Sequence, residues 1–188
     1  MLDRTLEQIE RAGCTIGLKS QFCMKEVVIV RFLCGAEGQS PETVKVIKIL
    51  EWKPCTCVRE ARAFIGVWVY YQIWIPKFAM LAKPMYNLFR KGVLWAWGIE
   101  HDLVMAALKE ALMAAPALVR IDYSEGAGAV ILAVDASLEG WGAILGQEDK
   151  KGKKHPSWYE SGLWNKAEAG YDVTKQECQV VLKAVQKV

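Results

Sequence analysis

Apolar residues recur at helical spacing up to about residue 115 and then give way to continuous apolar runs. Residues 2–12 place apolar side chains every three or four positions, and Gly13 follows them, which predicts a helix with a glycine stop. Residues 26–34, EVVIVRFLC, are rich in β-branched residues and predict a strand. Residues 1–38 are therefore expected to hold one helix and one strand.

The middle of the chain is expected to be helical. Ser40-Pro41-Glu42 combines a capping side chain, a proline suited to the first helical position and an acid that faces the helix dipole. Lys53-Pro54 should end that helix because proline cannot continue it. Three further helices are predicted from Val58 to Trp74, over residues 78–90 and over residues 101–114.

The pattern changes to strands beyond residue 117. Residues 128–134, GAVILAV, form a continuous apolar run and predict a strand buried on both faces. Residues 141–146 should be its hairpin partner, and residues 157–161 a third strand. A last helix is predicted from Lys175 to the end, and its apolar positions are Cys178, Val181, Leu182 and Val185. No cap or stop signal follows that helix, so we expect an incomplete second unit.

Composition favours a folded, soluble, intracellular protein. The hydrophobic fraction is 53% and the charged fraction is 24%, which is typical of globular chains. No uncharged apolar run is long enough to span a membrane, and the charged N-terminus does not resemble a signal peptide. The six cysteines include one C-x-C pair, which is a poor zinc signature, so we expect reduced thiols. We expect a cytoplasmic or nuclear location and no secretion.

Charge is distributed unevenly although the net charge is only +3. Residues 41–98 hold nine basic and three acidic side chains, and no acid lies between Glu60 and Glu100. Most of the tryptophans and tyrosines lie in the same segment. Basic residues interleaved with aromatic ones suit a nucleic-acid backbone. An aromatic core with ordinary solvated lysines would give the same composition, so both interpretations stay open.

Two carboxylates are candidate metal ligands. Asp135 ends the predicted strand, and Glu177 lies 42 residues later near the start of the last helix. Such acids can converge on Mg²⁺ or Mn²⁺, which prefer oxygen ligands and support two-metal hydrolysis of phosphodiesters. Asp135 could instead start a turn, and Glu177 could complete a capping box with Thr174. Spacing alone does not decide between these roles.

Seven segments together resemble the reverse transcriptase–ribonuclease H region of gypsy-type LTR retrotransposon polyproteins of a fungal type. They are LDRTLEQIERAG (2–13), KEVVIVRFLC (25–34), SPETVKVIKILEW (40–52), REARAFIGVWVYYQIWIPKFA (59–79), HDLVMAALKEALMAAPALVRIDYS (101–124), LAVDASLEGWGAILGQ (132–147) and YDVTKQEC (171–178). The resemblance implies an α+β fold in three parts. These parts are the end of the polymerase palm with a primer-grip-like hairpin (1–38), a helical thumb and connection (39–116), and the first part of a ribonuclease H-like domain (117–188).

The resemblance also implies functional residues. Asp135 and Glu177 match the first aspartate and the helix glutamate of the ribonuclease H site, which binds Mg²⁺ or Mn²⁺. The expected partner is a primer–template duplex or an RNA–DNA hybrid, with the rest of the polyprotein as a further partner. Basic residues expected to contact nucleic acid are Arg31, Arg59, Arg62, Lys77, Lys83, Arg90 and Lys91.

Some expected features of that family are missing from the 188 residues. They contain no aspartate pair of the polymerase type and no two aspartates after Glu177 to complete the ribonuclease H site. Arg31 stands where the family usually has glycine. We therefore expect a fragment, truncated at both ends, whose parent copies RNA into DNA and cleaves RNA in hybrids. The alternatives are a non-catalytic nucleic-acid-binding remnant and a decayed fragment that folds poorly.

Overall fold

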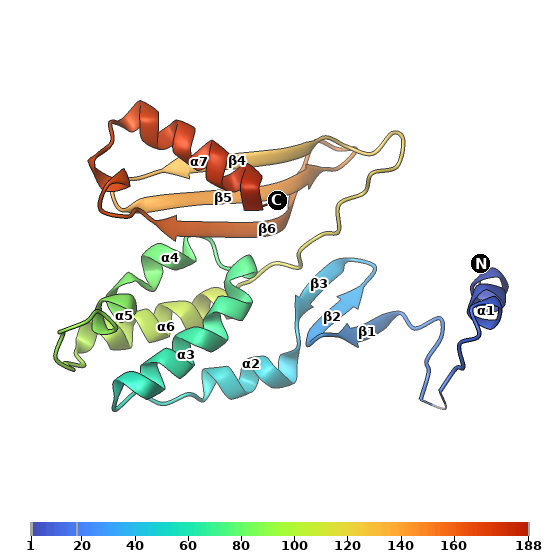
Figure 1. Cartoon of the computed structure of the whole chain (residues 1–188). Coiled ribbons are helices and arrows are strands. Elements are labelled where there is room, and N and C mark those ends of the chain that lie inside the picture. The colour runs from blue at the N-terminus through green and yellow to red at the C-terminus, as the bar shows by residue number, and fades with distance from the viewer. Residues whose placement is uncertain (1, 18, 188) are drawn as a thin grey trace.

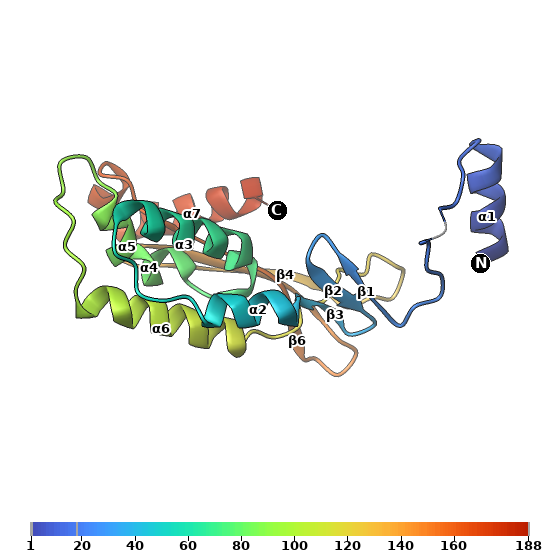
Figure 2. The same ribbon diagram turned by 90° about the horizontal axis from the view of Figure 1, so that it is seen from below.

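The computed structural model describes residues 2–17 and 19–187 and arranges them as two small sheets around a helical bundle (Figure 1). The N-terminal helix stands apart from the rest, beyond the first sheet (Figure 2). The first part holds α1 (Leu2–Arg11), β1 (Glu26–Ile29), β2 (Phe32–Gly35) and β3 (Gly38–Pro41). The bundle holds α2 (Thr43–Leu50), α3 (Val58–Tyr71), η1 (Gln72–Trp74), α4 (Phe78–Leu81), α5 (Lys83–Leu88) and α6 (Ile99–Met113). The last part holds β4 (Val130–Ala136), β5 (Gly140–Glu148), β6 (Lys154–Leu163), η2 (Glu168–Gly170) and α7 (Val173–Lys187).

The segment 26–34 is a hairpin and not one strand. β1 pairs antiparallel with β2, and Ile29 lies opposite Phe32. The two residues between the strands, Val30 and Arg31, both have left-handed backbones, with φ of 48° and 69°. Positive φ at both central positions is the geometry of a tight two-residue hairpin turn. Sequence patterning missed this turn because neither residue is a glycine or an asparagine.

The expected helix start at Ser40-Pro41 is also wrong. Both residues belong to β3, which pairs with β2, and the helix begins only at Thr43. Within α2, Ile49 is buried while Val44 and Ile47 are exposed. The pairing of β3 with β2 therefore overrides the local helix signal.

The bundle forms the larger core. Its centre is aromatic, and Phe64, Trp68 and Trp74 are fully buried. α3 and η1 run where one helix was expected, whereas the helix expected over 78–90 is divided into α4 and α5. Pro84 lies in the first turn of α5, where a missing N–H costs nothing. α6 lies close to its expected position.

The second sheet has the order β4-β5-β6, and every pair is antiparallel. β4 is thus an edge strand within the described residues, and Val130 and Val134 are 46% and 37% exposed. The expectation that this strand is buried on both faces is wrong, because each face carries exposed residues: Val130 and Val134 on the side of α7, and Ala133 and Asp135 on the other side. Its continuous apolar run did not reveal that position.

α7 covers one face of this sheet, but with a different side from the one expected. It buries Gln176, Val180 and Ala184, and it leaves Val181 and Leu182 half exposed. Val180 and Ala184 pack in one cluster with Trp141 and Trp164, and polar contacts lie beside this cluster. Lys183 forms a 2.8 Å ion pair with the carboxylate of Glu168, and Gln176 Nε2 donates to the carbonyl of the same residue.

The helical bundle packs against the other face of the second sheet (Figure 1). Tyr159 of β6 packs on the bundle core, and the backbone N–H of Ala79 donates to Ser161 Oγ at 2.9 Å. The three strands, together with Pro76 and Lys77 just before α4, therefore form the surface on which Asp135 lies.

Candidate nucleic-acid interface and carboxylate site

A groove with basic and aromatic walls lies between the β1–β2 turn, α2 and α3. Its volume is about 390 Å³. Arg31 stands at the turn, and Lys45 and Lys48 project from α2. Trp52 and Tyr70 line the same groove. Ammonium and guanidinium groups beside aromatic rings are suited to a phosphate backbone and the bases that it carries.

The turn that carries Arg31 is fixed to α3. The hydroxyl of Tyr70 donates to the backbone carbonyl of Val30, and the rings of Phe32 and Tyr70 stack at 5.0 Å. Burial raises the pKa of the Tyr70 hydroxyl, so it stays a neutral donor over a wide range of pH. Arg31 is therefore presented by a turn with little freedom to move.

Sequence analysis identified only one of the three cations in this groove. Lys45 and Lys48 were missed, although their spacing of three residues places them on the same side of a helix. The spacing of the two lysines indicates a binding surface only when the β1–β2 turn lies beside α2. The groove is thus a product of tertiary packing.

The other basic residues expected to contact nucleic acid lie elsewhere. Lys77 and Lys83 form ion pairs with Asp135 and Glu139, at 3.0 and 2.8 Å. The Arg62 guanidinium lies over the ring of Phe89, 5.7 Å from its centroid. The remaining three are exposed and do not line the groove: Arg59, Arg90 and Lys91.

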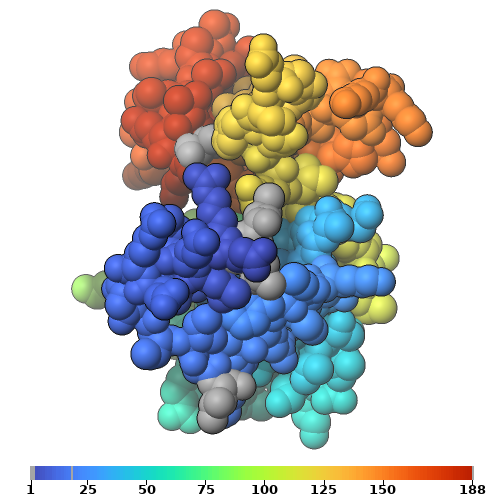
Figure 3. Space-filling model, turned by 90° about the vertical axis from the view of Figure 1, so that its right-hand side faces the viewer, coloured from blue at the N-terminus to red at the C-terminus, as the bar shows by residue number. Residues whose placement is uncertain are grey.

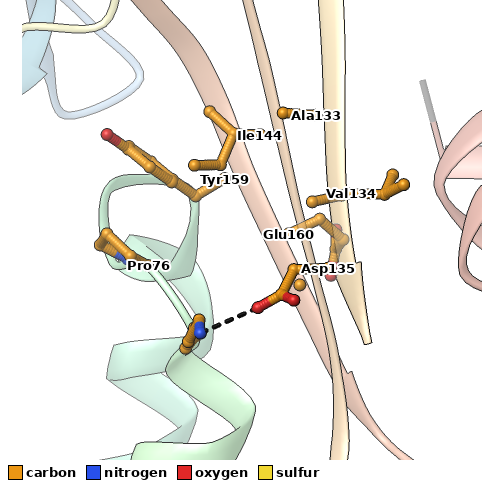
Figure 4. Close-up of a pocket in the computed structure, with 10 residues that line it drawn as sticks. Pro76, Ala133, Val134, Asp135, Ile144, Tyr159 and Glu160 are labelled. Atoms are coloured by element: carbon orange, nitrogen blue, oxygen red, sulfur yellow. Dashed lines mark ion pairs between the residues drawn. The ribbon is translucent and has the colours of Figure 1, made fainter. Parts of the chain in front are cut away.

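Asp135 lies inside β4, near its end, and faces the bundle. Leu132 and Ala136 pack toward α7, so strand alternation turns Asp135 to the opposite face. Figure 4 shows this carboxylate directed toward α4, whereas Val134 points the other way. Asp135 lines a mostly apolar pocket of about 110 Å³ at the boundary between bundle and sheet.

The ion pair with Lys77 explains where the carboxylate points. Lys77 precedes α4 with a left-handed backbone, φ 54°, and its Nζ lies 3.0 Å from Asp135 Oδ2. A Cβ at Gly142 would lie 3.8 Å from Cγ of Lys77, so this glycine leaves the lysine stem uncrowded. Both charged side chains are about 60% exposed, at 60% and 64%, so we expect a weak, screened pair.

Glu177 lies on α7, which covers the other face of the sheet, and its side chain is exposed. The capping alternative for this residue is wrong. α7 begins at Val173, so Thr174 lies within the helix, and Asp172 Oδ1 accepts the Lys175 N–H at 3.0 Å instead. The turn alternative for Asp135 also fails, because this residue is part of β4. The side chain that holds the β4–β5 turn is Ser137, whose hydroxyl bonds Gly140.

The arrangement does not make a metal centre by itself. Within residues 2–17 and 19–187, no three His, Cys, Asp or Glu side chains gather in a way that could hold an ion. The cationic partner of Asp135 is a lysine ammonium. Asp135 and Glu177 supply the oxygen chemistry that Mg²⁺ prefers, one from β4 and the other from α7.

Comparison with known proteins defines the class of domain. Residues 97–188 match the family described as the RNase H-like domain found in reverse transcriptase. This match confirms the ribonuclease H-like part of the expected fold.

The relatives are retrotransposon polyproteins. The chain is 29% identical over 181 residues to the transposon Tf2-3 and Tf2-4 polyproteins of Schizosaccharomyces pombe. The match covers 96% of this chain and only 13% of each relative. The expected resemblance to a retrotransposon reverse transcriptase polyprotein is therefore supported over nearly the whole chain.

Solved structures give the same fold. One is the foamy viral protease-reverse transcriptase dRH in complex with ds DNA, with a TM-score of 0.81 and 22% identity. It covers 99% of this chain, which corresponds to 32% of that protein. Another is the foamy viral protease-reverse transcriptase in complex with RNA/DNA hybrid, with a TM-score of 0.78 and 20% identity, which covers 100% of this chain and 26% of that chain.

Among the described helices, none has the length and apolar content needed to cross a bilayer.

Proposed function

We propose that this chain is part of a gypsy-type retrotransposon polyprotein and that it binds the duplex on which such an enzyme works. The parent would perform RNA-directed DNA synthesis and would cleave RNA in RNA–DNA hybrids with two Mg²⁺ ions. The role assigned to these 188 residues is to hold a primer–template duplex or an RNA–DNA hybrid. The similarity to Tf2 polyproteins over 96% of the chain supports this assignment.

The observation that carries the binding role is the groove of Arg31, Lys45 and Lys48. Three cations lie beside Trp52 and Tyr70, and none of the three takes part in a salt bridge within the described residues. Unpaired cations can neutralise phosphates and release counterions, which is the main source of affinity for nucleic acid. Lys77 and Lys83, by contrast, are already paired with acids.

Asp135 and Glu177 remain the proposed metal ligands of the parent enzyme. A divalent ion there would activate water and stabilise the attacking and leaving oxygens. The 188 residues alone should not turn over, because Asp135 faces the bundle whereas Glu177 is on α7, which covers the other face of the sheet. This placement of the two acids favours the alternative of a non-catalytic binding remnant. The exposed edge of β4 favours the other alternative, a fragment that aggregates, because unpaired strand edges promote association.

The test measures binding and cleavage in the same samples. An RNA–DNA hybrid is titrated with the chain at two salt concentrations with Mg²⁺ present, and the RNA strand is then examined for cuts. We expect salt-sensitive binding and no cleavage above an Asp135→Asn control. The double variant K45Q/K48Q should reduce the slope of log K against log salt by about two, because each lysine–phosphate contact contributes about one.

A matched control separates a specific groove from general charge. K19Q/K166Q removes two exposed lysines that do not line the groove and should leave the slope nearly unchanged. A salt-independent affinity, or equal losses in the two double variants, would contradict the groove assignment. Cleavage that disappears in Asp135→Asn would contradict the proposal that these residues do not turn over. Sedimentation of the free chain as large aggregates would favour the poorly folding fragment.

A further inference from the structure

Four lysines gather at the tip of the β5–β6 hairpin, away from the groove. They occupy positions 150, 151, 153 and 154 within the sequence DKKGKKH, and all four are exposed. The tip extends beyond the sheet (Figure 2). In the view of Figure 3, the orange segment around residue 150 projects at one side of the molecule. We call this segment, residues 149–154, the lysine turn.

The lysine turn is held rigidly by one carboxylate. Asp149 Oδ1 accepts the backbone N–H groups of Lys151 and Lys153, at 2.8 and 3.0 Å. Asp149 Oδ2 lies 2.9 Å from His155 Nε2. These bonds, led by that with His155, hold the pKa of Asp149 below its usual value, so the carboxylate stays ionised. Gly152 completes the turn with a left-handed backbone, φ 79°, which other residues adopt only with strain.

Both carboxylate oxygens of Asp149 are thus bonded within the turn, whereas the four lysines are exposed. No lysine of the turn forms a salt bridge among residues 2–17 and 19–187. Four like charges within five residues repel one another, and the acid beside them is Glu148, whose Oε1 would lie 3.3 Å from a Cβ at Gly152. A preformed turn also loses little conformational freedom on binding. These features suit an external polyanion with closely spaced charges.

We propose that the lysine turn is a second phosphate-contact site, which binds the backbone of the same nucleic acid that occupies the groove. A duplex carries one charge per about 1.7 Å of axis, so a projecting tip can meet several phosphates at once. This inference rests on the proposed function, because the groove supplies the other contact. The turn adds affinity without base specificity, since ammonium groups meet phosphates as point charges.

The experiment compares four proteins on an RNA–DNA hybrid of about 30 bp, roughly three helical turns. They are the native chain, K150Q/K151Q/K153Q/K154Q, the groove variant K45Q/K48Q, and a control with the same change in net charge, R11Q/K19Q/K25Q/K166Q. The slope of log K against log salt, which is negative, should become less steep by about two to three in the lysine-turn variant. At low salt its affinity should fall at least about tenfold more than that of the control.

Asp149→Ala provides a variant that keeps every lysine. It removes the carboxylate that orders the turn, so binding should weaken while net charge becomes more positive. Circular dichroism of each variant verifies that the fold is retained. Tighter binding by Asp149→Ala would overturn the proposal that an ordered turn is needed, because charge alone would then explain the affinity.

The remaining outcomes separate the inference from the proposed function. Loss of binding in the groove variant alone would overturn the lysine-turn proposal and leave the proposed function intact. No loss in either variant would overturn both. Displacement of the hybrid from the turn by poly-L-glutamate, as efficiently per charge as by unlabelled hybrid, would overturn the assignment to nucleic acid in favour of an acidic protein partner.

Discussion

Replacing Arg31 by glycine should stabilise the fold and weaken nucleic-acid binding at the same time. Arg31 has φ of 69°, a left-handed conformation that costs a side-chain-bearing residue about 1–2 kcal/mol. Glycine avoids this cost but gains about 0.5–1 kcal/mol of freedom in the unfolded chain. The net gain for Arg31→Gly is therefore roughly 0.5–1 kcal/mol. The guanidinium that lines the groove is lost in the same step.

Arg31→Gln is the matched control, because it also loses the charge but keeps the strained backbone. Urea denaturation should rank Arg31→Gly above Arg31→Gln by roughly 0.5–1 kcal/mol. In a chain of 188 residues this corresponds to about 2–4 °C in Tm per kcal/mol. Both variants should lose about one unit of salt slope on an RNA–DNA hybrid.

The two readouts test two separate statements about this residue. Equal stability of the glycine and glutamine variants would refute the argument from backbone strain. An unchanged salt slope in both variants would refute the role of Arg31 in the groove. Loss of stability in Arg31→Gly beyond that in Arg31→Gln would show that the side chain supports the turn through contacts.

Three further predictions concern the boundary between the parts of the fold. A double-mutant cycle of Lys77→Met and Asp135→Asn in urea should give a coupling free energy of only about 0.2–1 kcal/mol, because both side chains are largely exposed. A coupling near zero would show that the pair does not help to hold the bundle against the sheet. Gly38→Ala should cost about 2–4 kcal/mol in urea, because φ is 125° and a Cβ would lie 2.3 Å from the carbonyl oxygen of Leu118; a loss below about 1 kcal/mol would contradict this clash. Burial raises the pKa of the Glu160 carboxyl, so the native state keeps that proton to higher pH than the unfolded chain, and stability should fall as pH rises between the two pKa values. Glu160→Gln should therefore flatten the pH profile of Tm, and an unchanged profile would contradict the role of Glu160.

Sequence patterning was most successful where the periodicity of a single segment is enough to define its helix or strand. The expected helices over 58–74 and 101–114 agree closely with α3 plus η1 and with α6. The three strands of the second sheet also lie near their expected positions. It failed at Ser40-Pro41, where pairing of β3 with β2 replaces a strong helix start. It also failed on α7, where packing of Val180 and Ala184 against Trp141 and Trp164, together with the Lys183–Glu168 pair, turns another side of the helix to the sheet.

For the candidate sites, too, single segments identified residues, whereas their partners depended on the fold. Asp135 was identified from its place at the end of an apolar run, and the residues alone suggested an oxygen ligand. Its pairing with Lys77 was not predictable, because the two lie 58 residues apart in sequence and meet only when α4 docks on the sheet. Lys45 and Lys48 gained a role only when the β1–β2 turn was placed beside α2.

The sequence by itself determined the order of helices and strands, the basic character of the middle segment and the likeness to reverse transcriptase polyproteins. These properties depend on local periodicity, on charge and on residue order, which are all present in the unfolded chain. Tertiary structure alone decided which cations remain free, which carboxylate pairs with a lysine and which strand edge is exposed. Those properties depend on contacts between distant segments, because a charge acts on another group only across the few ångströms that packing creates.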